Sequence, residues 1–261
     1  MILLNKFGFT YLSYKALYSF QTLRLFILFR ILDPFMHYLF FATLVSAIAG
    51  PEYLSYVVLG NVVFYTGRTM MINFMSMFRG ERQYGTLELN IASPTSTFVI
   101  ISRKAVVPLL DGLFVFIVGL IISRLLFGIE LPVEQFAHLL LLFVVTMFSL
   151  LSFSLLFACV SLLFSNVNLF LNFMIASFQV FCGVNFSVSL LPGPMEAVAR
   201  VLPLTNSIEA IRSIYQLEYN AISPLLLNEL MVGAAYFIIA LILVNVMERL
   251  ARRQGALFKN V

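Results

Sequence analysis

The sequence predicts an all-α membrane protein with six transmembrane helices, and two observations carry this prediction. Hydrophobic residues make up 61% of the chain and charged residues 11%, whereas soluble domains are about half apolar and a quarter charged. Apolar runs of about 20 residues, long enough to cross a bilayer core, recur along the chain without strand-type alternation. The whole chain is therefore expected to form one transmembrane domain, 1–261. Its expected spans are 24–48, 55–78, 98–126, 137–164, 167–190 and 224–247.

Basic residues orient these spans. With six spans, most Lys and Arg residues fall on one side of the membrane, which the positive-inside rule assigns to the cytoplasm. We therefore expect a multi-pass protein of the plasma membrane, bacterial or archaeal, with both termini in the cytoplasm. The net charge of +4 is scattered rather than gathered in one patch, which argues against a nucleic-acid partner. The basic residues on the expected cytoplasmic side are Lys6, Lys15, Arg24, Arg79, Arg82, Arg103, Lys104, Arg249, Arg252, Arg253 and Lys259.

The segment before the first span, 1–23, has an amphipathic pattern. Tyr11, Tyr14 and Tyr18 recur at helical spacing beside Lys15. Aromatic rings and lysine side chains are typical of the membrane–water interface. We expect an interfacial helix on the cytoplasmic side, with an earlier start of the first span as the alternative.

A charged loop, 79–97, follows the second span on the cytoplasmic side. Four charged residues stand between aliphatic ones, a glycine provides a hinge, and a Ser-Pro pair closes the segment. This pattern is typical of a short helix docked into a cleft of another protein. The charged residues are Arg79, Glu81, Arg82 and Glu88.

The segment 191–220, before the last span, lies on the outer side in this topology. Pro192, Pro194 and Pro203 interrupt it, so the moderately apolar stretch between them is too short to cross the bilayer. We expect an external re-entrant segment.

The charged loop resembles the coupling region of type 2 ATP-binding-cassette transporter permeases. The resemblance rests on Glu81-Arg82, on Gly85-Thr86-Leu87-Glu88 and on Ser93-Pro94, while Gln83 and Asn90 depart from the family pattern. It extends to the external segment, where Leu191-Pro192, Leu202-Pro203-Leu204-Thr205 and 208–212 look like the family's re-entrant hairpin. The loop is more similar to the multidrug-efflux and lipo-oligosaccharide branch than to the long-polysaccharide branch.

This resemblance implies a permease subunit that exports an amphiphilic or lipophilic compound: a drug, a lipid or a lipo-oligosaccharide. The implied partners are a second copy of the chain or a related permease, two nucleotide-binding ATPase subunits, and membrane lipid. The chain itself has no P-loop motif, so no cofactor is expected in it, and ATP and magnesium would bind the partner. The residues implied in ATPase coupling are Arg79, Glu81, Arg82, Gly85, Thr86, Leu87, Glu88, Ser93 and Pro94.

Charged residues inside spans are costly, and they are usually paired or functional. Asp33, Arg68 and Asp111 lie at similar depths, roughly 14–16 Å from the cytoplasmic ends of the first three spans. They are predicted to form one ion-pair cluster. The cluster either fixes the packing of three helices or acts in gating or substrate contact.

Two spans carry polar stripes at a spacing of three or four residues. Such stripes should face protein or water rather than lipid, and the family resemblance implies that both border the translocation path. Ordinary interhelical hydrogen bonds are the alternative. The candidate path residues are Asn61, Tyr65, Thr69 and Asn73 on the second span and Asn168, Asn172 and Gln179 on the fifth.

Catalytic and metal-binding patterns are not recognisable. His37 and His138 lie on different spans without partners at ligand spacing, so we expect no metal site and no catalytic residues. Two other functions stay open. One is export of a lipid-linked polysaccharide or teichoic-acid-like polymer, and the other is ion-driven secondary transport with Asp33 and Asp111 as carriers.

Overall fold

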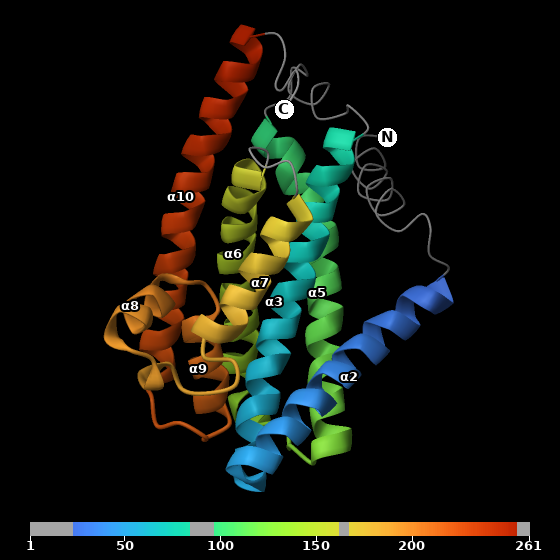
Figure 1. The fold of residues 1–261 in the computed structure, drawn as a ribbon, viewed down its shortest axis with the longest axis vertical. Coiled ribbons are helices and arrows are strands. Elements are labelled where there is room, and N and C mark those ends of the chain that lie inside the picture. The colour runs from blue at the N-terminus through green and yellow to red at the C-terminus, as the bar shows by residue number, and fades with distance from the viewer. Residues whose placement is uncertain (1–22, 84–96, 162–166, 255–261) are drawn as a thin grey trace.

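The computed structural model describes residues 23–83, 97–161 and 167–254, in which the regular elements are helices and no strand occurs (Figure 1). Short 3₁₀ turns at Pro51–Tyr53, Val133–Gln135 and Val188–Leu190 join some of the helices. The long helices are α2 (Leu23–Ala49), α3 (Leu54–Gln83), α5 (Thr97–Phe127), α6 (Phe136–Ser161), α7 (Val167–Phe181) and α10 (Ile222–Gln254); the short ones are α8 (Gly193–Val201) and α9 (Thr205–Ile214).

The expected all-α polytopic membrane fold is confirmed. Each expected span begins within two residues of the first residue of a long helix. Among the described residues, four helices are long and apolar enough to cross a membrane. These segments are Ile27–Ala49, Val99–Phe127, Val133–Val160 and Ile222–Val246.

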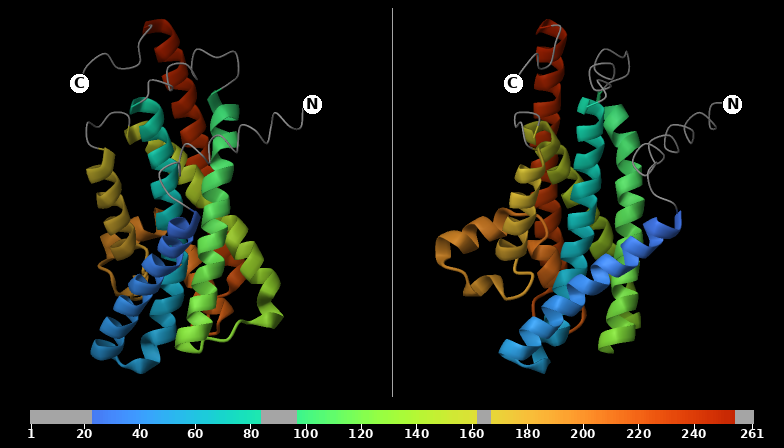
Figure 2. Two further views of the ribbon diagram at one scale, coloured as in Figure 1. Left: turned by 90° about the vertical axis from the view of Figure 1, so that its right-hand side faces the viewer. Right: turned by 45° about the vertical axis from the view of Figure 1, so that its right-hand side comes forward.

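Helix α3 is long but less apolar than these four, and its position explains why. It lies in the middle of the bundle and packs against α2, α5, α6, α7 and α9 (Figures 1 and 2). Most of its side chains from Val57 to Met77 are buried. Because α3 packs against five other helices, most of its polar side chains face protein, and high hydrophobicity is not required of it.

Helix α7 corrects the expected fifth span. The prediction extends this span to 190, but the helix ends at Phe181 and has 15 residues, about 22 Å of rise. The backbone leaves the helix at Gly183, whose φ of 68° is a left-handed conformation that glycine adopts readily. The apolar composition continues past this turn, so composition alone places the end too late.

The charged loop is also corrected in part. Residues 79–83 do not begin a separate helix, because they continue α3 to Gln83. Residues 84–96 lie outside the described residues, and so does nearly all of the expected interfacial helix, 1–23.

The segment 191–220 folds into α8 and α9. All ten residues of α9 are buried, and α9 packs against α3, α6 and α10. Its N-terminus follows Leu204, whose φ is 81°, and Glu229 of α10 accepts a hydrogen bond from the Leu204 backbone N–H at 3.0 Å. This carboxylate supplies the cap that the residue before α9 lacks. Figure 1 places α8 and α9 toward the end of the bundle opposite the last residues of α3.

Candidate functional site

The polar side chains of α3 meet partners from α2, α5 and the segment after α7. Because α3 is central, its residues at helical spacing reach several neighbours. Asn61, Tyr65, Thr69 and Asn73 are all buried. Asn61, Tyr65 and Asn73 each belong to one of three polar groups that follow one another along the helix.

The first group joins α2, α3 and α5. Arg30 of α2 lies 2.6 Å from the Asp111 carboxylate of α5, measured from Nη2 to Oδ2. Arg30 also donates to the Asn73 side-chain oxygen at 3.2 Å, and the Asn73 amide donates to Asp111. The Asp111 side chain is only 4% exposed. This hydrogen-bonded ion pair, with a buried carboxylate, connects the three helices.

The second group joins α2 and α3 at an open face. The Arg68 guanidinium lies 3.7 Å from the Asp33 carboxylate, and the Tyr65 hydroxyl donates to the same carboxylate. Arg68 also lies over the Tyr65 ring, 5.0 Å from its centroid. The Asp33 side chain is 61% exposed and that of Arg68 is 30% exposed. In contrast to Asp111, the Asp33 carboxylate is not covered by the part of the chain that the structure describes.

The predicted single cluster of Asp33, Arg68 and Asp111 is therefore corrected. Asp33 pairs with Arg68, whereas Asp111 pairs with Arg30, which sequence reasoning missed. A signal was present, because Arg30 lies three residues before Asp33 and close to the same face of one helix. Arg30 and Arg68 lie on different helices at expected depths that differ by about one helical turn. Depth alone therefore cannot decide which of the two pairs with Asp111.

The third group lies nearer the α8–α9 end. His37 Nε2 is 3.0 Å from the Asn61 side-chain oxygen, and the Asn61 amide donates to Asn185 at 2.9 Å and to the Val57 carbonyl at 2.8 Å. His37 is thus a packed, hydrogen-bonded side chain. Asn185 is a further residue that the sequence did not single out, because it follows the unexpected turn after α7.

The polar residues of α7 lie on a less covered face. Asn168 and Asn172 are exposed, and Gln179 is partly buried. Arg79, at the end of α3, donates a hydrogen bond to Asn168. It is the predicted coupling residue whose side chain is described: Glu81 and Arg82 are placed by backbone alone, and Gly85, Thr86, Leu87, Glu88, Ser93 and Pro94 lie outside the described residues.

Within the described ranges, no group of three His, Cys, Asp or Glu residues is arranged to hold a metal ion. The groups above supply paired charges and amides, which bind and orient but do not form a nucleophile–base pair.

The exposure of Asp33 limits what can lie beside the face of the bundle that α2 and α3 form. Asp33 lies ten residues into α2, about 15 Å along the helix, inside an apolar segment that is long enough to span. An uncovered carboxylate at such a depth costs about 2.5–3.5 kcal/mol on insertion scales. The face formed by α2 and α3 around Asp33 therefore requires water or protein beside it.

Comparisons with known proteins give one finding. The model of the ABC-2 type transporter family matches residues 9–215, which is most of the chain and includes all three polar groups. Among curated proteins, none matches the chain.

Proposed function

The chain belongs to the ABC-2 type transporter family, and on that premise we propose that it exports an amphiphilic or lipophilic compound across the plasma membrane, driven by separate ATPase subunits. It is a multi-pass membrane subunit of an ABC transporter. The proposed cargo is a drug, a lipid or a lipo-oligosaccharide. The proposed complex holds two permease chains and two ATPase subunits, with both termini in the cytoplasm.

One observation supports an assembly of permease chains, namely the uncovered polar face of α2 and α3. Asp33 and Arg68 are paired but exposed, and α7, which also packs against α3, presents Asn168 and Asn172. Lipid would offer these exposed groups no hydrogen bonds beyond those that they make within the chain. A second permease chain, a water-filled path between the chains, or both would satisfy them.

The continuity of α3 supports coupling to an ATPase. This helix runs from the three polar groups to Gln83, at the start of the proposed coupling loop. Arg79 links its end to Asn168 of α7. A displacement of the loop would thus move α3 and α7 together as a rigid body.

The test is co-purification of the ATPase from native membranes in mild detergent. The charge-reversed variant Glu88→Arg changes the proposed coupling loop. The matched control is Glu134→Arg, which makes the same change in the exposed 3₁₀ turn Val133–Gln135. We expect a P-loop ATPase with the wild type and with the control, and none with Glu88→Arg.

Two outcomes would contradict the proposal. Equal recovery of the ATPase with all three proteins would show that Glu88 and its loop are not needed for binding of the ATPase. Recovery of intact permease without an ATPase in any sample would favour an ion-driven carrier instead.

A further inference from the structure

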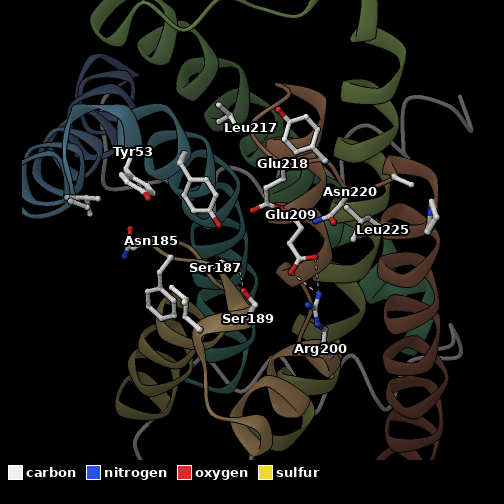
Figure 3. A pocket seen from close by; sticks show the side chains of 18 residues that line it. Tyr53, Asn185, Ser187, Ser189, Arg200, Glu209, Leu217, Glu218, Asn220 and Leu225 are labelled. Atoms are coloured by element: carbon white, nitrogen blue, oxygen red, sulfur yellow. Dashed lines mark hydrogen bonds and ion pairs between the residues drawn. The ribbon is translucent and has the colours of Figure 1, made fainter.

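A cavity of about 1060 Å³ opens at the α8–α9 end of the bundle (Figure 3). Its walls come from the last turn of α2, the first residues of α3, the segment 185–190, the two short helices, and the residues that lead into α10. Drug-sized ligands occupy cavities of about 300–1,000 Å³. The cavity is thus large enough for an organic molecule, and it lies apart from the three polar groups along α3, except that Asn185 borders both.

The wall of this cavity is held by a buried arginine. Arg212 of α9 is 1% exposed, and it donates to the carbonyl of Val184 at 2.7 Å and to that of Tyr56 at 3.2 Å. Its guanidinium also stacks over the Tyr56 ring at 3.5 Å. Burial lowers the pKa of Arg212 to about 10, against the opposing influence of Tyr56 and Glu218, so the group remains charged at neutral pH. The cavity is therefore preformed by the fold.

The charges around the cavity leave a negative surplus. Arg200 donates to Glu209 at 2.8 and 2.9 Å (Figure 3). It also donates to Glu196 at 3.4 Å, so two carboxylates already engage it. Glu218 lies 3.9 Å from Arg212. Of these groups, Arg200, Glu209 and Glu218 line the cavity, and they sum to one net negative charge. An anionic ligand would meet carboxylates and would find Arg200 occupied. Glu218 is also engaged, by Arg212 at 3.9 Å and by Asn220, which donates to it at 3.1 Å, but the net negative charge of the lining favours a cation.

Aromatic and apolar side chains complete the lining. Tyr53 is 50% exposed and Tyr219 is fully exposed, and both line the cavity. Tyrosine rings attract cations through their π faces by about 0.5–2 kcal/mol. Val45 and Ala49, from the end of the apolar helix α2, add a surface on which an alkyl or aromatic tail can rest.

We propose that this cavity binds a cationic amphiphile, with the cationic head between Glu218 and the tyrosine rings and the apolar part against the end of α2. The inference deepens the proposed function by naming a substrate class, and it rests on that function only for the transport of the bound molecule. Binding itself requires neither ATP nor the ATPase, so the two proposals can fail separately.

The experiment measures equilibrium binding of radiolabelled dodecyltrimethylammonium to the purified chain in nanodiscs of zwitterionic lipid. We expect saturable binding that dodecyl maltoside and dodecyl sulfate do not displace, and weaker binding of tetramethylammonium, which lacks the tail. Displacement by the uncharged or the anionic detergent at equal concentration would overturn the assignment of a cation.

Variants locate the site within the cavity. Tyr219→Ala removes a ring whose surface is fully exposed, so packing is retained, and it should weaken binding about 2- to 30-fold. Tyr219→Phe keeps the π face and should restore most of the affinity. Glu218→Gln should also weaken binding, whereas Glu134→Gln, an exposed glutamate outside the cavity, should not. Unchanged binding in both Tyr219→Ala and Glu218→Gln would overturn the proposal, even if the ATPase co-purifies.

Discussion

The pairs Arg30–Asp111 and Arg68–Asp33 have the same chemistry but opposite surroundings. Both involve α2, and both have a side chain of α3 bound to the carboxylate, Asn73 in one and Tyr65 in the other. The side chain of Asp111 is 4% exposed and that of Asp33 is 61% exposed. The first pair is complete within one chain, whereas the second depends on what lies beside the chain. Similar ion pairs thus have different surroundings in one chain, and the proposed function assigns packing to the first and assembly to the second.

The largest effect expected from this comparison is the loss of stability in Asp111→Ala. Removal of the carboxylate takes the counter-charge of Asp111 from Arg30, whose side chain is 22% exposed, and this should lower the free energy of unfolding by about 3 kcal/mol, the lower end of the range for buried pairs. Asp33→Ala is the matched control. This change should lower the free energy of unfolding by less than about 1 kcal/mol, because the Asp33–Arg68 pair is exposed. Titration of each variant with sodium dodecyl sulfate in mixed micelles measures both values. Equal losses would refute the distinction between the pairs.

A smaller loss is expected for Asn73→Ala. Asn73 accepts from Arg30 and donates to Asp111, so its removal leaves the buried Asp111 and the partly buried Arg30 with fewer partners, which should destabilise the chain by about 1–3 kcal/mol. Asn172→Ala, on the exposed face of α7, should change the free energy of unfolding by at most about 0.5 kcal/mol. The same denaturation assay distinguishes the two residues. An effect of Asn172→Ala as large as that of Asn73→Ala would contradict the assignment of a buried network.

The smallest effect, and the one that sharpens the role of the exposed pair, concerns assembly. Asp33→Asn should leave the stability of the chain nearly unchanged, but it should weaken association between copies about fivefold, equivalent to about 1 kcal/mol. Energy transfer between donor- and acceptor-labelled chains in liposomes reports this association. Asp111→Asn in the same assay is the comparison. Association unaffected by Asp33→Asn would show that water alone covers this face.

Charge reversal provides an internal check on the exposed pair. If Asp33 and Arg68 act together, the double variant Asp33→Arg/Arg68→Asp should recover part of the association that either single variant loses. Absence of recovery would indicate that each residue contacts a different group of the neighbouring chain.

The candidate site could be predicted only in part. The polar stripe of α3 is recognisable because Asn61, Tyr65 and Asn73 recur at helical spacing in an apolar run, and the structure buries all three. The partner of Asp111 was not predictable, because depth along a span does not specify the rotation and tilt of α2. The cavity could not be foreseen either, since its walls come from segments far apart in the chain.

The sequence by itself determined the helical membrane fold, the starts of the long helices and the family, because hydrophobic run length and local motifs are properties of contiguous residues. Tertiary structure alone decided three features: the pairing of Arg30 with Asp111, the end of α7 at Phe181, and the cavity wall that Arg212 of α9 holds in place. Each of these depends on how helices rotate and pack against one another. That arrangement is set by many distant contacts and cannot be read from any single segment.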